Sequence, residues 1–584
     1  MKAVTTVFLA LLAIAALTTA ATAQDRERYV RFTINDKAEL HDITRMISIA
    51  RVDHDTVLAY ANEKEWATLR ASGYDAVDLP YPDLEVDHTM SNTPAGLMEW
   101  DAYPTYQAYL AMMNQYAATY PSLCMLDTIG LSVQGRLILA LKISKHVTVR
   151  EDEPQVLYTS TMHGNETTGF IMLLRLADYL LTQYGQPTAE GERVRNLVDN
   201  TEIWLNPLFN PDGTYRKGAD TTVNKATRGN AHGVDLNRNF PDRVSDSNNT
   251  TTGREAETQA MMRWTSKHSI TLSANFHGGA QVVNYPWDNG VTSGQYSKCP
   301  DDAWFVHLSR AYATPNPDIM NGGFANGITN GCEWYEIFGG RQDWMYVWNG
   351  GRETTIELTN TSNPPGSYLP QRWTNNKESF LAYLEQALKG IRGVVTDAVT
   401  HAPLKARIDV AGVPNVPVFT DSTVGDFHRL LLPGTYSIIV QAPGYGSDTV
   451  QNVVINDSLA TRVDVALLST VPVTEGPSGL LHQFVLSQNY PNPFNPTTVV
   501  RYQLPEVSEV ELVVYDLLGR EVAVLVNERE APGGHAVQFD GSRFSSGVYI
   551  YTLRAHLLSE GQARHTDGGQ AGDFVQTKRL VLLK

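Results

Sequence analysis

The spacing of apolar positions alternates between two periods along residues 97–389. Helical periodicity is clearest where apolar side chains recur at i, i+3, i+4, i+7 and i+11, at Phe170, Leu173, Leu174, Ala177 and Leu181. Short apolar runs of strand type lie between such segments, at Val156–Ser160, Glu202–Leu205, Ile270–Phe276 and Thr354–Leu358. Strands interleaved with helices predict an α/β fold whose mixed, mainly parallel sheet is flanked by helices.

A smaller αβ region is predicted at residues 24–96. Two apparent strands, Tyr29–Ile34 and Thr56–Ala61, alternate with helical stretches at Asp36–Ile47 and Glu63–Ser72. The region ends in the acidic, proline-containing run DLPYPDLEVDH. A compact unit followed by an exposed connector fits a removable pro-domain and fits a permanent N-terminal domain equally well, so both interpretations stay open.

Two β-rich regions follow the long section. Residues 390–468 hold short strand-like runs separated by turn signals such as Pro433-Gly434, with no helical period, which predicts a small β-sandwich. Residues 469–481 form a linker rich in Pro, Gly and Ser, and residues 482–584 are again β-rich. We therefore expect two small all-β, sandwich-like domains after the α/β section.

The first 23 residues have the pattern of a secretory signal peptide. Lys2 gives a positive start, Val7–Leu17 is an apolar run, and Ala21-Thr22-Ala23 is a small-residue cleavage site. The alternative is a membrane anchor, but threonines interrupt the run, which is shorter than the roughly 18 residues of a spanning helix. We expect an exported protein, secreted or held at the cell surface, with no transmembrane segment.

Charge and cysteine content narrow the function further. There are 46 Lys and Arg residues against 63 Asp and Glu residues, a formal net charge of −17. This disfavours nucleic acid or an anionic membrane as the main partner and suits a cationic substrate. Three cysteines without a CxxC pattern are too few for a disulfide scaffold, and they do not indicate a cysteine-held metal.

Candidate chemistry is found just after the predicted strands, where parallel sheets gather their sites. His163 and Glu166 follow one strand three residues apart, Asn206 follows another, and His277 closes a third. Imidazole and carboxylate are good zinc ligands, although a single HxxE pair arises readily by chance. Glu357 interrupts an apolar strand, and a carboxylate there is costly to bury unless it faces a solvated pocket.

The motifs together resemble the zinc metallocarboxypeptidases, in particular the regulatory branch of carboxypeptidases D, E, M and N. They occur in the family's order over about 290 residues: HGNE, NPDG, DLNRNFP, NFHGG, NYPWD, GITNGCEWY, GGRQDW and IEL. The resemblance implies one zinc ion per chain, with His163, Glu166 and His277 as ligands. It further implies Asp235 as the acid that orients a ligand histidine and Glu357 as the catalytic glutamate.

The same resemblance implies roles for the substrate-facing residues. Asn237 and Arg238 match the clamp on the substrate's terminal carboxylate, Arg228 the carbonyl-polarising arginine, and Tyr335 the tyrosine that closes over the peptide end. These roles describe an exopeptidase that uses a zinc-activated water and a glutamate general base.

Substrate preference follows from two positions. Asp288 and Gln342 match the Lys- and Arg-specific branch, so the expected partners are peptide or protein ends with basic residues. The alternative for Asp288 is a loop acid with no role in the pocket.

The C-terminal regions carry resemblances of their own. IRGVVTD and LLPGTYSIIVQAPGY resemble the transthyretin-like domain of the same branch. The motifs QNYPNPFNPTTVVRYQLP, YDLLGREV and SSGVYIYTL are similar to the C-terminal sorting domain of type IX secretion cargo, which implies that secretion machinery as a partner. The insertion-like stretch HLLSEGQARHTDGGQ before GDF is expected to be an exposed loop.

Two other functions remain as alternatives. One is a zinc amidase of the same fold that acts on cell-wall peptides or other amides, and the other is a non-catalytic surface binding protein. The presence of Asn237, Arg238 and Asp288 disfavours the first, and the presence of Glu357 with all three ligands disfavours the second.

Overall fold

The computed structural model describes residues 27–82, 86, 88–216, 218–414, 416–470, 484–557 and 573–583. The expected signal peptide, part of the acidic connector and most of the linker lie outside these residues. The chain divides into two units, one ending at Thr470 and the other beginning at Val471. The predicted domain boundaries within these units stay predictions.

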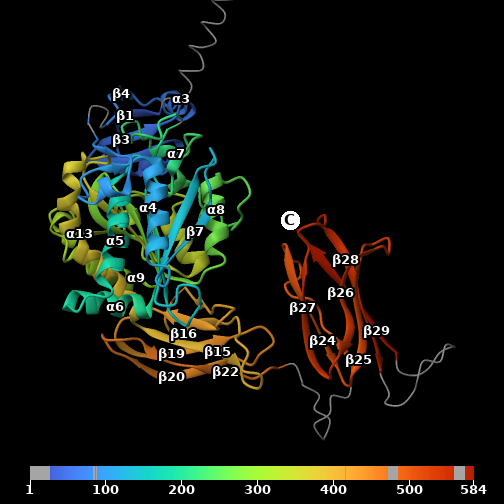
Figure 1. The fold of residues 1–584 in the computed structure, drawn as a ribbon. Helices are drawn as coiled ribbons and strands as arrows, with labels where there is room; N and C mark the ends of the chain where they lie inside the picture. The colour runs from blue at the N-terminus through green and yellow to red at the C-terminus, as the bar shows by residue number, and fades with distance from the viewer. Residues whose placement is uncertain are drawn as a thin grey trace, which may run out of the picture. The chain divides into compact units, whose positions relative to one another are not determined.

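A mixed eight-stranded sheet occupies the centre of the first unit (Figure 1). Its order is β13-β12-β14-β11-β9-β10-β8-β7, and the neighbours β14, β11, β9 and β10 are parallel. The strands are β7 (Cys124–Leu131), β8 (Leu137–Ile143), β9 (Gln155–Ser160), β10 (Glu202–Asn206), β11 (Ile270–His277), β12 (Ala280–Tyr285), β13 (Ile328–Asn330) and β14 (Arg352–Thr359). The predicted fold class is confirmed, with antiparallel pairs between β12 and β14 and along β10, β8 and β7.

Helices cover both faces of this sheet because its strands alternate between two apolar cores. Tyr158 of β9 lies in one core and its neighbour Leu157 in the other. The first core contains side chains of α4 (Tyr106–Thr119), α5 (Thr168–Gln183), α6 (Ala189–Asn200), α9 (Asp302–Ala313) and α13 (Leu369–Leu384). The second contains α8 (Ala256–Thr265).

Helix α5 is buried more completely than its predicted apolar face suggests. Ile171 and Met172, outside the predicted stripe, are buried together with Phe170 and Leu173. The helix packs against the neighbouring helices α6 and α13 as well as against the sheet. It therefore passes through the middle of the core, and the turn that precedes it is held rigidly.

The N-terminal region forms a separate four-stranded antiparallel sheet of order β2-β3-β1-β4. Its strands are β1 (Arg28–Thr33), β2 (Ser48–Asp53), β3 (Thr56–Ala61) and β4 (Val77–Leu79), and its helices are α2 (Leu40–Met46) and α3 (Glu63–Ala71). The helices cover one face around a small apolar core. The predicted strands and helices are present, and β2, which no pattern indicated, is the strand nearest the catalytic part.

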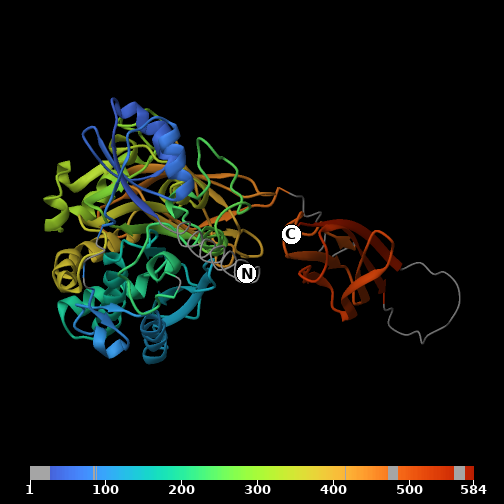
Figure 2. The same cartoon turned by 90° about the horizontal axis from the view of Figure 1, so that it is seen from above.

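The first β-rich region packs against the opposite end of the central sheet from the N-terminal region (Figures 1 and 2). It comprises β15 (Ile391–Asp397), β16 (Arg407–Val410), β17 (Val418–Phe419), β18 (Asp426–Arg429), β19 (Gly434–Gln441), β20 (Asp448–Ile455), β21 (Thr461–Arg462) and β22 (Val465–Leu467). A buried ion-pair network joins the two parts: Asp301 accepts hydrogen bonds from Arg352 of β14 at 2.8 Å and from Arg429 of β18 at 2.5 Å.

The second unit is a β-sandwich in its own right. One sheet contains β23 (Val485–Leu486), β24 (Thr497–Leu504) and β27 (Gly533–Asp540). The other contains β25 (Ser508–Tyr515), β26 (Glu521–Glu530), β28 (Gly547–Leu557) and β29 (Asp573–Leu582). Side chains from both sheets share one apolar core. The predicted exposed loop before Gly572 falls mostly outside the described residues.

Two smaller predictions concern cysteines and membrane helices. Cys124, Cys299 and Cys332 are buried and none forms a disulfide. Among the described residues, no helix combines the length and the apolar character needed to cross a bilayer.

Candidate active site

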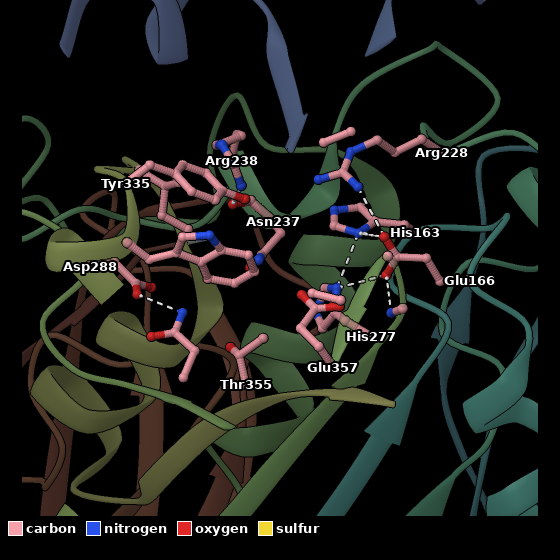
Figure 3. Close-up of a pocket in the computed structure, with 17 residues that line it drawn as sticks. His163, Glu166, Arg228, Asn237, Arg238, His277, Asp288, Tyr335, Thr355 and Glu357 are labelled. Atoms are coloured by element: carbon pink, nitrogen blue, oxygen red, sulfur yellow. Dashed lines mark hydrogen bonds and ion pairs between the residues drawn. The ribbon is translucent and has the colours of Figure 1, made fainter. Parts of the chain in front are cut away.

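Three predicted metal ligands meet at the carboxyl ends of β9 and β11 (Figure 3). His163 and Glu166 lie in the turn between β9 and α5, and His277 is the last residue of β11. The Nδ1 atoms of the two histidines are 3.0 Å apart, and the two oxygens of Glu166 each lie 2.9 Å from one of them. All three side chains are buried.

This donor set fits a zinc ion. Two imidazole nitrogens that face each other at 3.0 Å would direct their lone pairs at one another, which is unfavourable unless a proton or a cation lies between them. Burial lowers the pKa of His277 to about 4, which keeps the ring neutral as a metal ligand must be. Two histidines and one glutamate are a known catalytic zinc set that leaves a position for water.

The turn that carries these ligands is fixed by glycines and by Asn210. A Cβ atom on Gly164 would lie 2.2 Å from the backbone of Gly213, so the HGNE and NPDG segments touch directly through their glycines. Asn210 caps α7 (Pro211–Thr214) by accepting from Gly213 N, and its amide donates to the carbonyl of Met162 at 3.2 Å. The two motifs therefore form one structural element.

Asp235 orients the ring of His163. One of its oxygens lies 3.0 Å from His163 Nε2, and the same oxygen accepts from Asn237 N at 2.8 Å. Burial by itself would raise the pKa of Asp235, but the charges of His163 and Arg228 hold it well below its ordinary value. An ionised carboxylate on the far nitrogen fixes the tautomer of a metal-binding histidine.

Arg228 lies against the ligands. Its Nη1 donates to Glu166 at 2.9 Å, and its Nε donates to Ser48 at 2.6 Å and to Asp235 at 3.2 Å. The guanidinium lines the cleft, as predicted, and it also contacts Ser48 of the N-terminal region, which the sequence did not indicate.

Asn237 and Arg238 lie across the cleft from the ligands, at the end of the short helix η3 (Leu236–Arg238) (Figure 3). Asn237 Oδ1 accepts from Arg341 N at 3.0 Å. The Nε and Nη2 atoms of Arg238 are buried and have no hydrogen-bond partner among the described residues. Unpaired guanidinium donors in a cleft suit an incoming carboxylate.

Glu357 forms the floor of the cleft beside His277. Strands β11 and β14 are parallel, and His277 and Glu357 are partners in their register. Burial, followed by the charge of Glu166, raises the pKa of Glu357 well above its ordinary value. Its Oε2 atom is buried without a partner within the described part of the chain. The carboxyl group is thus free to exchange a proton with a molecule in the cleft.

Asp288 is at the far end of the same cleft and is 2% exposed. Its Oδ1 accepts from Gln342 Nε2 at 3.0 Å and from Asn284 Nδ2 at 3.3 Å. Gln342 also accepts from Thr355 N at 2.7 Å, which ties Asp288 to the strand of Glu357. Burial raises the pKa of Asp288 to about 7.

The N-terminal region lies over this cleft. Ala50, the extra residue where the register of β2 shifts, lines the cleft directly. Tyr335, at the rim, packs against the apolar core of the N-terminal region. The space left inside is about 30 Å³, room for a few water molecules. This is far less than the roughly 300 Å³ or more of a typical ligand pocket.

Comparisons with known proteins give one consistent result. The zinc carboxypeptidase profile matches residues 109–379. Carboxypeptidase M of Mus musculus is 37% identical over 352 residues, covering 58% of this chain and 77% of its own length. The carboxypeptidase N catalytic chain of Homo sapiens is 35% identical over 385 residues, covering 60% of this chain and 82% of its own.

This chain belongs to the zinc carboxypeptidase family. The three clustered residues His163, Glu166 and His277, together with Glu357 and Arg238, line one cleft of this family member. Carboxypeptidase D of Drosophila melanogaster is 40% identical over 365 residues, but the match covers only 26% of that longer protein. The chain spans about a quarter to a third of the carboxypeptidase D relatives.

The two β-rich regions of this chain also match known domains. Residues 390–468 match a carboxypeptidase regulatory-like domain, and residues 488–560 match a secretion system C-terminal sorting domain. Among solved structures, carboxypeptidase A from Helicoverpa armigera is 18% identical with a TM-score of 0.45, covering 62% of this chain and 97% of that one.

Apart from the glycines of the NFHGG motif, sequence reasoning missed six residues that line the cleft: Ala50, Ala280, Asn284, Trp334, Ile337 and Thr355. Asn284 and Trp334 belong to the NYPWD and GITNGCEWY motifs and could have been found there. Ala50 carries no signal because its position depends on how the N-terminal region docks. Asn206, expected among the strand-end polar groups, instead donates to Leu139 O at 2.7 Å and does not line the cleft.

Proposed function

We propose that this carboxypeptidase removes a C-terminal Lys or Arg from peptides and proteins outside the cell. One observation carries the proposal: Asp288, a buried acid, lies in the same cleft as Glu357 and Arg238, whose Nε and Nη2 atoms have no partner among the described residues. A carboxylate-binding group, a proton-transfer group and an acid for a cationic side chain are the three features that a basic C-terminal residue requires.

The clamp accounts for cleavage at the chain end. Arg238 and Asn237 bind the terminal carboxylate, because a guanidinium fork matches two carboxylate oxygens and the Nε and Nη2 atoms of Arg238 have no partner among the described residues. A peptide without a free carboxylate at this position would leave the guanidinium donors unsatisfied. Endopeptidase activity is therefore disfavoured.

Proton transfer belongs to Glu357. It takes a proton from the attacking water and later delivers that proton to the leaving amine, as general base and then general acid. Zinc, held by His163, Glu166 and His277, supplies Lewis acidity when bound. Arg228 stabilises the oxyanion that develops on the scissile carbonyl, and Tyr335 closes over the peptide end.

Side-chain choice belongs to Asp288 and Gln342. A cationic side chain that reaches Asp288 displaces its proton and forms a charge-assisted pair. An apolar side chain leaves the acid unpaired in a buried pocket, which costs binding energy. Basic ends should accordingly be preferred over aromatic and aliphatic ends.

A substrate assay tests this proposal. Purified protein is incubated with peptides ending in Arg, Lys, Phe or Glu, with and without a chelator, and with cell-wall fragments. Release of Arg and Lys that the chelator abolishes supports the proposal. Preferential cleavage of cell-wall fragments would favour the alternative zinc amidase, and loss of all activity in the trimmed, zinc-loaded protein would favour a binding protein.

We further propose an export route and domain boundaries. Residues 1–23 direct export and are removed, residues 97–389 catalyse, residues 390–468 form a transthyretin-like domain, and residues 482–584 direct type IX secretion. The sorting-domain match at residues 488–560 supports the last of these assignments. Fractionation of cells carrying the full chain and a chain without residues 482–584 tests it, with retention of the shortened chain as the expected outcome.

Residues 24–96 are proposed to act as a removable cover. The region contacts both sides of the cleft, with Ser48 at Arg228 on one side and Arg45 over the ring of Phe338, 4.1 Å from its centre, on the other. His41 adds an ion pair of 2.7 Å to Glu336 next to that ring. The small remaining space in the cleft favours the interpretation as a removable cover and disfavours the interpretation as a permanent domain.

A further inference from the structure

A second buried acid lies directly behind Asp288. Asp343 follows Gln342 in α12 (Arg341–Trp344) and is 2% exposed. Its two carboxylate oxygens accept from the backbone N–H of Asp288 at 3.1 and 3.3 Å. Asp343 does not line the cleft, so any effect on a substrate must pass through Asp288.

A cation lies along the loop that carries Asp288. The guanidinium of Arg243 lies over the ring of Trp287, 4.2 Å from its centre, and its Nη2 donates to Asn289 O at 2.5 Å. Arg243 thus touches both residues that flank Asp288 in sequence. A positive charge in this position competes with a substrate's cationic side chain for the charge of Asp288.

Asp343 is the carboxylate that faces this cation. Arg243 Nε lies 3.6 Å from Asp343 Oδ2. Burial, followed by the charge of Asp288, raises the pKa of Asp343 well above its ordinary value, although Arg243 and the Asp288 amide oppose the rise. The two groups that face this carboxyl group, Arg243 and the Asp288 amide, are N–H donors, which suit its ionised form.

The other charged groups near the pocket are already engaged. Asp242 accepts from Asn289 Nδ2 at 2.6 Å and from Gly339 N at 3.1 Å. Arg238 faces the cleft and is assigned to the substrate's terminal carboxylate. The remaining polar neighbours of Asp288, the amides of Asn284 and Gln342, are uncharged.

We propose that Asp343 is a positioning residue for substrate choice: it pairs with Arg243 and thereby leaves the charge of Asp288 to the substrate. This inference rests on the proposed basic specificity. When a Lys or Arg side chain is bound, Asp288 and Asp343 then face that cation and Arg243, with Asp242 as a further buried acid nearby. Without the charge of Asp343, the same two cations face one carboxylate fewer, which disfavours a basic side chain and leaves an apolar one unaffected.

A charge-rescue experiment tests the pairing. The ratio of kcat/KM for an Arg-ended peptide to that for a Phe-ended peptide is measured above the pH at which Asp288 ionises. Asp343→Asn keeps an oxygen that can accept from the Asp288 amide but loses the charge. It is expected to lower the ratio about tenfold or more. Adding Arg243→Gln should return the ratio to within about threefold of wild type.

The matched control is a double variant that combines Asp343→Asn with Arg243→Lys in place of Arg243→Gln. Lysine keeps the positive charge, so the ratio should stay low. Glu333→Gln, which removes an exposed acid of α11 (Gly331–Trp334), should leave the ratio unchanged. Zinc content and activity on the Phe-ended peptide report whether each variant is folded.

The outcomes separate two failures. A wild-type ratio near one overturns the proposed specificity itself. A high wild-type ratio that Asp343→Asn does not change, or that Arg243→Gln does not restore, overturns the pairing alone. If Asp343→Asn does not fold, Arg243→Gln in the wild-type background decides: an equal or higher ratio supports the pairing, and a lower ratio contradicts it.

Discussion

Ser48 donates a hydrogen bond to Asp235, the same carboxylate that holds the ring of His163. The hydroxyl of Ser48 also accepts from Arg228. The N-terminal region is therefore joined by hydrogen bonds to Asp235 and Arg228, the residues proposed to orient a metal ligand and to polarise the substrate. Moving this region would change the surroundings of both groups in addition to opening the cleft.

Removal of residues 24–96 is expected to increase activity. The chain beginning at Gln24 and one trimmed near residue 97 are compared by kcat/KM on an Arg-ended peptide. Because the covered cleft has room for only a few water molecules, the trimmed form should be at least about tenfold faster, which corresponds to about 1.4 kcal/mol of activation free energy.

A point substitution tests the same contact without shortening the chain. Ser48→Ala removes the hydroxyl between Arg228 and Asp235 and should raise the activity of the untrimmed protein, while Ser72→Ala on the exposed end of α3 should not. Equal activity of trimmed and untrimmed protein would show that residues 24–96 are a permanent domain.

Glu357→Gln should retain zinc and lose turnover. The residue is not one of the three clustered ligands, so metal content measured by atomic absorption should stay at about one ion per chain. Loss of a general base typically lowers the rate by about 10²–10⁴-fold. Near-normal kcat in the zinc-loaded variant would contradict the assignment of Glu357 as the general base. Glu353→Gln is unsuitable as a control because Glu353 forms a buried ion pair with Arg341.

Asp288→Ala should lose most activity on basic ends and keep activity on apolar ends. Removing one partner of a buried charge pair costs about 2–5 kcal/mol, roughly 30- to several-thousand-fold in rate. Activity on a Phe-ended peptide should persist or improve, since Arg238 still binds the carboxylate and no unpaired acid remains. An unchanged Arg-to-Phe ratio in kcat/KM would leave the specificity of the enzyme open.

The preference for basic ends should increase with pH. Asp288, with its pKa raised to about 7, is neutral below this value and ionised above it, and only the ionised form pairs with a cation. The Arg-to-Phe ratio of kcat/KM should fall about tenfold for each pH unit below 7 and level off above it. Taking the ratio cancels titrations common to both substrates, and Asp288→Ala should abolish the pH dependence.

The strand-end chemistry could be predicted from sequence because it depends on local patterns. His277 closes an apolar strand and Glu357 interrupts another, and the parallel register makes them partners. The family motifs then related Asp288 to the same cleft. Each of these inferences needs only the strand order and a match to known motifs.

The rest depends on contacts between distant segments. Ser48 meets Asp235 across 187 positions, and nothing in the sequence of β2 marks that contact. The same holds for Arg243 and Asp343. They are far apart in sequence, and both contact the loop that carries Asp288. Sequence periodicity reports which face of an element is buried, but not which partner covers it.

Asp301 binds one arginine from the α/β part, Arg352, and one from the regulatory-like domain, Arg429, so a cut in the gene between these two parts separates the three residues. A recombinant chain that stops at residue 389 would lack Arg429 and leave Asp301 and Arg352 in a cavity that β18 had sealed. Asp301 would keep Arg352 and Tyr346 as hydrogen-bond partners but lose one of its two arginines. Arg352 begins the strand on which Glu357 lies, so the damage would reach the catalytic floor. Evolutionary exchange of the regulatory-like domain would accordingly require an arginine that reaches this site.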